Sequence, residues 1–526
     1  MLATAHTIAL QGSTGHLIEV QVDISPGVVG ATIVGRPDAS LMEARDRVRM
    51  AITHAAPRWP STRRVTILLS PADLPKRGTH FDLAIAMGIK AADAGVPREA
   101  LRDTVFLGEL ALDGGLRPVP GVLPMVMAAA ARGFGRVFVP EPQAAEAALV
   151  PGIEVYGVRS LTQVVAQLCG EIVPVAAPVT ELKAASTLSW RGQDRREKVD
   201  MLDLVGLSDA KYAVEVAAAG GHHVLLSGPK GSGKTSLAER IPTILPDLTR
   251  EEALELTAVW SLSGPIESAT GVLVRPPFSA PHHDASKASI LGGGTGRVRP
   301  GELSRAHCGV LFLDEFPLFR SDVIEALRQP LESGEVRVVR GDDAATFPAG
   351  GMVVLAANPC PCGEFHPSAG LDRCECPEVA RREYRRKVSG PISDRIDIVR
   401  HVLPAQPHER DPFAPREGSP EIRERVTRAR LRQHQRYAGL GWRLNAQAPG
   451  HLLRERWPLP DAEQHRVDDE VYAGRLSRRG AIRVHRLAWS VADLAAVDEP
   501  GEREVETALR LRTGEPLRSS DLGRVG

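Results

Sequence analysis

Hydrophobic and polar residues follow two different periods near the start of the chain. Residues 16–24 (HLIEVQVDI) and 64–70 (RVTILLS) alternate apolar and polar side chains, which is typical of half-buried β-strands. Residues 40–56 and 82–94 instead repeat their apolar positions with a helical period. Residues 1–172 are therefore predicted to form a first domain of mixed strands and helices.

The pattern then changes twice along the chain. Residues 173–198 mix proline, alanine and threonine with a charge run and are interpreted as a linker. Residues 199–402 alternate short apolar stretches with helical patterns, which predicts an α/β core built on a parallel sheet with helices on both faces. Residues 403–526 open with a proline-rich break, after which 419–515 are helical in pattern and strongly basic.

The most informative motif lies inside the α/β core. An apolar stretch at 224–226 leads into GPKGSGKT at 228–235, and a helical pattern follows at 236–241. This spacing between a strand and a helix indicates a phosphate-binding loop, whose glycines let backbone N–H groups and the helix N-terminus face phosphate oxygens. We expect Lys234 to reach the β- and γ-phosphates and Thr235 to bind Mg²⁺. A glycine-rich turn with a chance lysine is the disfavoured alternative. The residues expected to bind ATP are Gly228, Pro229, Lys230, Gly231, Ser232, Gly233, Lys234, Thr235 and Ser236.

A second motif follows about eighty residues later. Residues 310–313 are all apolar, as in a strand buried on both faces of a parallel sheet, and Asp314 and Glu315 come directly after them. In a phosphate-loop ATPase the first acid holds Mg²⁺ and the second polarises the attacking water. Such a strand alone often just ends at a solvated turn, but its order and distance after the phosphate loop favour the catalytic interpretation.

The composition limits the possible partners. The 526 residues include 65 basic and 65 acidic residues, so bulk charge predicts neither a nucleic-acid nor a membrane partner, and a DNA site has to be a local basic patch. Aromatic residues make up 4%, which argues against stacking platforms for single strands. The sequence has no apolar run long enough to span a membrane. Six cysteines and no recognisable export signal indicate a cytoplasmic protein.

Four stretches of the chain carry a resemblance to a known family. They are 203–235, 281–316, 327–341 and 355–398. Together they resemble the magnesium-chelatase-like AAA+ ATPases of the ComM/YifB type, and the resemblance covers nearly the whole chain. It implies a homohexameric, Mg²⁺- and ATP-dependent ring whose best-understood relatives migrate branched DNA in homologous recombination and natural transformation. It also implies that residues 403–526 form the helical lid.

The resemblance assigns further catalytic residues. Asn358, in VVLAANP, corresponds to the sensor-1 residue that orients water, although an asparagine capping the turn before Pro359 is the alternative. Arg395, in SDRID, resembles an arginine finger that acts on ATP held by the neighbouring subunit. Its alternative is a surface arginine paired with Asp394 or Asp397, a contact of little energetic value.

One assignment in the lid stays open. Arg479 and Arg483, in LSRRGAIR, share a helical face and match the sensor-2 helix of the family. Arg479 fits the sensor-2 position best, but the adjacent Arg478 and a plain basic surface remain alternatives. Gly480 and Ala481 depart from the bulkier residues of the family.

Two segments are expected to contact DNA phosphates. Residues 331–347 predict a β-hairpin with a turn near 341–343. In motors of this type the hairpin points into the pore, where Arg337 and Arg340 would bind DNA without reading its sequence. Residues 281–299 resemble a second pore loop. Ordinary solvated surface loops are the alternative for both. The basic residues of this second segment expected to contact DNA are Lys287 and Arg297.

Four of the six cysteines lie within seventeen residues of one another. They form a C-x-C pair, eleven intervening residues and a second C-x-C pair, which permits a structural Zn²⁺ site with four thiolate ligands. Reduced cysteines without a metal are an equally open interpretation, because C-x-C is less common in zinc sites than C-x₂-C. The cysteines are Cys360, Cys362, Cys374 and Cys376.

The first domain resembles the proteolytic domain of Lon-type proteases, most clearly at 66–89. Those enzymes use a serine and a lysine, but here His80 stands at the serine position and Leu123 at the lysine position. Ser70 and Lys76 occur nearby, but no motif brings them together. We therefore predict a domain without peptidase activity that serves ring assembly or DNA contact. A motor that remodels a protein during metal insertion is the alternative overall function, and an ATP-dependent protease is disfavoured.

Overall fold

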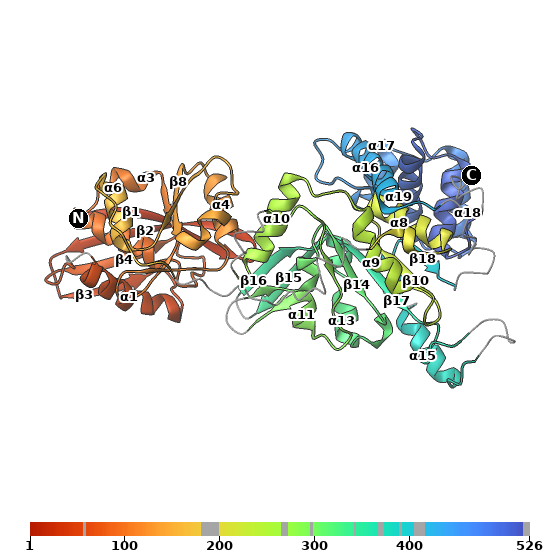
Figure 1. Ribbon diagram of the computed structural model, residues 1–526, viewed down its shortest axis with the longest axis horizontal. Coiled ribbons are helices and arrows are strands. Elements are labelled where there is room, and N and C mark those ends of the chain that lie inside the picture. The colour runs from red at the N-terminus through yellow and green to blue at the C-terminus, as the bar shows by residue number, and fades with distance from the viewer. Residues whose placement is uncertain are drawn as a thin grey trace.

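The computed structural model has three parts in a row along its longest axis (Figure 1). A sheet domain from the N-terminal half lies at one end, a second sheet lies in the middle, and helices of the C-terminal segment lie at the other end. The residues that the structure describes are 1–55, 59–179, 199–264, 272–294, 298–340, 343–365, 373–388, 392–403 and 416–518.

The N-terminal domain is a seven-stranded mixed sheet covered by helices. Its strand order is β3-β4-β2-β1-β5-β8-β9, with β1–β2 and β2–β4 antiparallel and the remaining neighbours parallel. The two strands and two helices predicted from the sequence in this domain are confirmed. The strands are β1 Leu2–Gln11, β2 Thr14–Ser25, β3 Gly30–Val34, β4 Arg64–Ser70, β5 Thr104–Phe106, β8 Arg136–Pro140 and β9 Glu154–Val158, and β6 Glu109–Leu110 and β7 Leu116–Arg117 form a separate pair. The helices are α1 Ala39–Ala55, α2 Asp82–Ala92, α3 Glu99–Arg102, α4 Val122–Ala130, α5 Ala144–Ala147 and α6 Leu161–Cys169.

The middle part contains a five-stranded sheet in the order β11-β14-β17-β10-β18, with all neighbours parallel. Successive residues of β10 and β14 contribute to two different apolar clusters, one on each face, because strand side chains alternate. The predicted α/β core with helices on both faces is confirmed. The strands are β10 Val224–Ser227, β11 Phe278–Ser279, β14 Val310–Leu313, β17 Met352–Ala357 and β18 Ile398–His401. The helices are α8 Ser208–Gly220, α9 Lys234–Ile244, α10 Arg250–Ser261, α11 Lys287–Leu291, α12 Glu302–Arg305, α13 Ser321–Ala326 and α14 Pro330–Ser333.

Two smaller two-stranded sheets accompany the five-stranded sheet. The predicted hairpin is confirmed as β15 Glu335–Arg340 paired with β16 Asp343–Pro348, although residues 330–333 belong to a short helix instead. Its turn residues, 341 and 342, lie outside the described part of the chain. The second piece pairs β12 Gly292–Gly293 with β13 Arg299–Pro300, within the segment 281–299.

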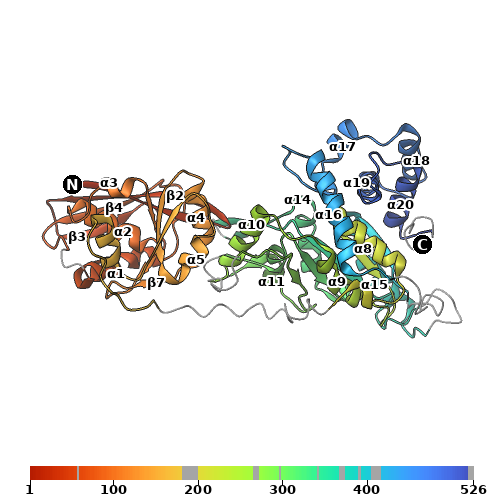
Figure 2. The same ribbon diagram turned by 45° about the horizontal axis from the view of Figure 1, so that its top comes forward.

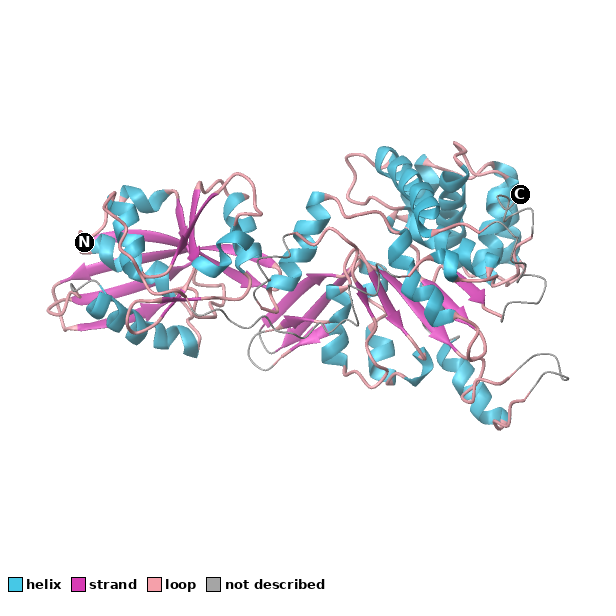
Figure 3. Ribbon diagram, viewed as in Figure 1, coloured by secondary structure: helices cyan, strands magenta, loops and turns pink. Residues whose placement is uncertain are grey.

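The C-terminal segment is helical, as predicted (Figure 3). The long helices α16 and α19 pack against each other and against α8 of the core (Figure 2). The helix α15 Glu378–Val388, between the core and this segment, extends away from both. The helices are α16 Ser419–Arg436, α17 Gly450–Arg456, α18 Asp461–Tyr472, α19 Arg478–Ala495 and α20 Glu502–Thr513. Among the described residues, no helix has both the length and the apolar composition needed to cross a bilayer.

The N-terminal domain rests on two elements of the core. Gly121 N, at the start of α4, donates to Ser261 O at the end of α10 (3.0 Å). On the other side, the β1–β2 turn meets the hairpin, where Ser13 Oγ donates to Thr346 O (3.3 Å). Gly12 in this turn has φ +66, and a Cβ there would lie 2.4 Å from Thr346 O. The hairpin therefore has one side in contact with the N-terminal domain.

Candidate nucleotide site

The phosphate loop follows the carboxyl end of β10, and its backbone requires glycine. Gly231 and Gly233 have φ of +73 and +94, in the left-handed region that other residues rarely adopt. At Gly228 a Cβ would lie 2.0 Å from Val402 O. The motif therefore has glycines where this turn sterically needs them.

Lys234 begins helix α9 and folds back into the loop. Its Nζ donates to Gly228 O (2.7 Å), Pro229 O (2.8 Å) and Asn358 Oδ1 (3.2 Å). Burial lowers the pKa of Lys234, while the carboxylates of Asp314 and Glu315 oppose that shift. Within the described residues, the buried hydroxyl of Ser232 has no hydrogen-bond partner. A loop with one buried cation and one unsatisfied hydroxyl fits the phosphate groups of ATP.

Two oxygen ligands suitable for Mg²⁺ already lie together. Thr235 Oγ1 donates to Asp314 Oδ2 (2.9 Å), and Asp314 Oδ1 accepts from Glu315 N (2.9 Å). Hard oxygen ligands beside phosphate oxygens are what Mg²⁺ prefers. Glu315 has φ +50, and its side chain is 42% exposed, with Oε2 3.9 Å from His283 Nδ1. Its carboxylate is accessible to solvent next to Thr235 and Asp314, the residues expected to bind Mg²⁺.

Strand order explains why these residues meet. Strand β17 lies between β10 and β14, and all three run in the same direction. Their carboxyl ends therefore share one edge of the sheet, and Asn358, just past β17, lies beside Lys234. The phosphate loop, Asp314, Glu315 and Asn358 are thus brought together by topology.

Arg395 and Arg479 lie at the opposite edge. Arg395 precedes β18, which pairs in parallel with β10, so it is near the amino ends of the strands. A four-residue strand spans about 13 Å, and this separates Arg395 from the phosphate loop of its own chain. Arg395 Nη2 contacts Glu332 Oε1 at 3.1 Å, and Arg479 Nη1, on a 62% exposed side chain, contacts the same oxygen at 3.4 Å. Both arginines therefore converge on one carboxylate.

Arg483, the other lid arginine weighed from the sequence, has a structural role. Its guanidinium donates to Asp394 O (2.8 Å) and to the buried carboxylate of Asp397. Burial acts to raise the pKa of Asp397, but Arg483 and two histidines hold it well below the usual range. His223 N also donates to Asp397 Oδ2 (2.9 Å). Sequence reasoning missed this link between lid and core, because its partners are far apart in the chain.

Comparisons with known proteins agree with this architecture. Residues 200–410 match the model described as "Magnesium chelatase, subunit ChlI", 20–143 match "Subunit ChlI of Mg-chelatase", and 416–512 match "Magnesium chelatase, subunit ChlI C-terminal". The competence protein ComM of Haemophilus influenzae is 37% identical over 515 residues, covering 97% of both chains. The chain belongs to the ComM/YifB family of magnesium-chelatase-like proteins.

Further relatives support the assignment of this chain to the ComM/YifB family. An uncharacterized protein of Mycobacterium tuberculosis is 44% identical over 513 residues, covering 97% of this chain and 98% of that protein. The uncharacterized protein YifB of Escherichia coli is 36% identical over 512 residues, covering 97% of both. The magnesium-chelatase 38 kDa subunit of Rhodobacter capsulatus is 26% identical over 171 residues, or 30% of this chain and 49% of that subunit. Membership identifies an AAA+ ATPase of the magnesium-chelatase type, a family that uses ATP and Mg²⁺.

The residues expected to contact DNA come from separate elements of this ComM/YifB protein. Arg337 is exposed on β15, and Lys287 is exposed at the start of α11. Arg340 ends β15, but its side chain is not among those described, and Arg297 lies outside the described residues. Their role in DNA binding stays a prediction.

The two positions of the missing Lon-type dyad are packed into the N-terminal domain. His80 is buried, and its Nε2 lies 2.9 Å from Ile8 O. Leu123 is fully buried in α4. Lys76 is buried as well and donates to Pro71 O. The absence of peptidase activity stays a prediction, as does the resemblance of this domain to Lon-type proteases.

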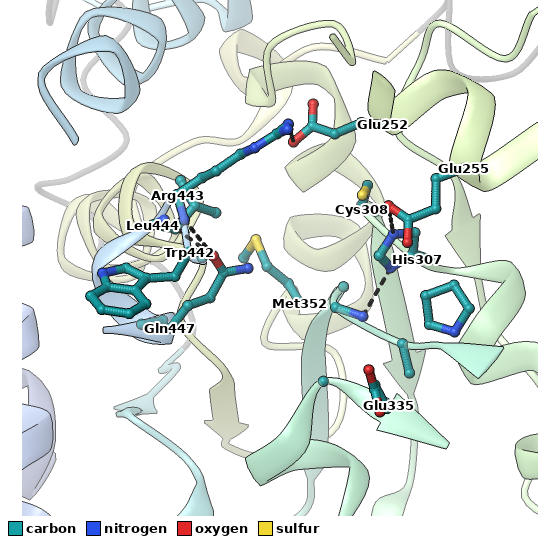
Figure 4. Close-up of a pocket in the computed structure, with 18 of the residues that line it drawn as sticks. Glu252, Glu255, His307, Cys308, Glu335, Met352, Trp442, Arg443, Leu444 and Gln447 are labelled. Atoms are coloured by element: carbon teal, nitrogen blue, oxygen red, sulfur yellow. Dashed lines mark hydrogen bonds and ion pairs between the residues drawn. The ribbon is translucent and has the colours of Figure 1, made fainter. Parts of the chain in front are cut away.

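A cavity of about 520 Å³ lies near the amino ends of the core strands, where α10, the hairpin and the lid meet (Figure 4). Two pairs of charged groups line it: Glu255 lies 3.4 Å from His307, and Arg443 from the lid lies 3.8 Å from Glu252. Burial raises the pKa of Cys308 in its wall, so this thiol is not a reactive nucleophile. The cavity lies between the lid and the core, at the edge of the sheet opposite the phosphate loop.

Proposed function

We propose that this ComM/YifB protein is an ATP-driven motor that assembles as a homohexameric ring and promotes branch migration of DNA in homologous recombination or natural transformation. One observation supports assembly into a ring. The residues around the phosphate loop gather at one edge of the sheet, whereas Arg395 lies at the other edge. A complete site therefore needs Arg395 from a second copy of the chain.

Each residue of one chain has a task in this proposal. Thr235 and Asp314 would hold Mg²⁺, which neutralises phosphate charge when it is bound. Glu315 accepts the proton of the attacking water, because its carboxylate is solvent-accessible beside those ligands. Lys234 exchanges its carbonyl partners for phosphate oxygens, and Asn358 keeps its amide next to that cation.

Arg395 completes the site from the neighbouring subunit. A guanidinium placed at the γ-phosphate stabilises charge that develops in the transition state. Arg479 shares a carboxylate partner with Arg395, so we assign both to the same subunit interface.

Two observations support the DNA role. Arg337 is exposed on a hairpin that leaves the core at the edge where the two arginines lie. A relative that covers 97% of this chain is named a competence protein. Phosphate contacts by such arginines give affinity that does not depend on sequence.

Steady-state ATP hydrolysis tests both parts. The wild-type protein is assayed without DNA, with single-stranded DNA and with a four-way junction, and Glu315→Gln serves as the inactive control. We expect DNA to stimulate hydrolysis, most strongly with the junction. A hydrolysis rate that is the same with and without each DNA would refute the DNA motor but not the ATPase activity.

Subunit mixing tests the arginine finger. Lys234→Ala lacks a functional phosphate loop, and Arg395→Ala lacks the finger, so each alone should be inactive. Mixed rings contain interfaces with an intact loop and an intact finger, and part of the activity should return. Arg320→Ala is the matched control, because Arg320 pairs with Asp322 on the surface (3.1 Å). No recovery on mixing would contradict action between subunits.

A second candidate is a motor that remodels a protein partner during metal insertion. Its support is the match of residues 200–410 to the magnesium chelatase model and the similarity to a magnesium-chelatase subunit. This function predicts ATP hydrolysis that is indifferent to DNA and stimulated by a protein partner. The four clustered cysteines add Zn²⁺ to ATP and Mg²⁺ as an expected cofactor in either case.

A further inference from the structure

Four cysteines from two separate segments converge in space. Cys360 and Cys362 follow β17, whereas Cys374 and Cys376 precede α15. The sulfur atoms of Cys360 and Cys362 are 3.2 Å apart, and Cys374 Sγ lies 3.5 Å and 3.6 Å from them. All four ligand atoms lie within 4.8 Å of one another. We name this group the four-cysteine cluster.

These separations suit a tetrahedral metal rather than disulfides. A disulfide bond is about 2.05 Å long, and the structure joins none of these four cysteines in a disulfide. A metal with four sulfur ligands at about 2.3 Å has ligand–ligand separations of about 3.8 Å, close to those observed. Thiols alone are weak hydrogen-bond donors and give little reason for four of them to gather at one point.

The ligand set selects the metal and its role. Four thiolates favour Zn²⁺ over the harder Mg²⁺ and Ca²⁺. Four protein sulfur atoms would fill every position of a tetrahedral ion and would leave none open for water or substrate. The site is therefore structural, and the chemistry of ATP hydrolysis does not pass through it.

The first pair of cysteines lies against the phosphate loop. Gly363, next to Cys362, has φ +83, and a Cβ there would lie 2.8 Å from the side chain of Lys230. Asn358 precedes Cys360 by two residues. Any shift of this pair therefore changes the wall of the nucleotide site.

The second pair of cysteines leads into α15, which is attached to the same region. The phenol of Tyr384 in α15 lies close to the backbone of Asn358. The guanidinium of Arg381 lies 5.0 Å from the centre of the Phe365 ring, which follows the first pair. Lys387 Nζ donates to Pro317 O (3.0 Å), just after Glu315. Outside these contacts α15 extends away from the core (Figure 1).

We propose that the four-cysteine cluster binds one structural Zn²⁺, which links the segment after Asn358 to α15 and so stabilises the wall of the nucleotide site. This inference does not depend on the DNA role, since it concerns only how the site is held together.

Metal content of the purified full-length protein tests the proposal. Plasma mass spectrometry should find about one zinc per chain, without added zinc. Cys374→Ser should lower zinc at least about tenfold. Cys169→Ser and Cys308→Ser are the matched controls, because both cysteines lie outside the cluster, and they should keep the zinc.

A second measurement needs no variant. In the wild-type protein, titration with a mercurial reagent should release zinc as the four thiols react. A colorimetric zinc indicator measures the released zinc. Trypsin should then cut faster within α15, which contains several arginines. Protein with less than about a tenth of a zinc per chain, iron in place of zinc, or zinc retained by Cys374→Ser would each overturn the proposal.

Discussion

The buried ion pair between Arg483 and Asp397 gives the sharpest stability prediction. Both side chains are nearly inaccessible, at 10% and 2% exposure, and the pair joins the lid helix α19 to the segment before β18. Replacing Arg483 with methionine leaves a buried carboxylate without its cation, which costs about 3 kcal/mol of the free energy of unfolding. A folded unit of about 150–250 residues, such as the core or the core with the lid, loses about 2 °C of melting temperature per kcal/mol of lost stability. The expected decrease in melting temperature is therefore about 6 °C.

Tryptophan fluorescence is the assay, because Trp442, Trp457 and Trp489 all lie in the lid. Arg475→Met is the matched control, since Arg475 pairs with Glu470 at the surface (2.6 Å), and it should shift melting by less than about 2 °C. An Arg483→Met protein that melts within about 1 °C of wild type would refute the reasoning. Adding Asp397→Asn to Arg483→Met should recover about 1 kcal/mol, because the unpaired charge is removed.

Three further changes test other parts of the molecule. Glu332→Gln should raise DNA-independent ATP hydrolysis about two- to fivefold, because Arg395 no longer has to leave a carboxylate, and an unchanged or lower steady-state rate would contradict this. Burial lowers the pKa of His223 to about 4, against 6.5 when unperturbed. Its contribution to stability is therefore complete above pH 6.5 and is lost as the pH falls towards 4, by up to about 3 kcal/mol. The melting temperature of His223→Gln should therefore depend less on pH across this range than that of the wild type. The same dependence on pH in both proteins would exclude His223 as the cause. Gly12→Val would place a Cβ against Thr346 O and should speed tryptic cleavage of the hairpin, whereas an unchanged cleavage rate would show that this contact is dispensable.

The sequence predicted the elements that depend on local pattern. The apolar residues 310–313 became β14 with the same bounds, because a strand buried on both faces needs only a short apolar stretch. The glycine spacing at 228–235 predicted a tight turn after β10, and the turn has glycines at positions where its geometry demands them. The five-stranded order then follows from packing over long distances and brings Asn358 beside Lys234.

Contacts between distant segments could not be predicted in this way. Arg479 and Arg483 share a helical face, and only the position of Asp397 distinguishes a buried arginine from an exposed one. The convergence on Glu332 likewise joins residues from separate elements. The cysteine spacing permits a metal site but does not by itself bring the two pairs together.

The contact between the N-terminal domain and the hairpin has a mechanical consequence. The domain touches the core at two places, α10 and β16, and extends outward along the longest axis of the molecule (Figure 1). A small rotation of the hairpin would therefore be magnified at the distant strands β3 and β4, as at the end of a long arm.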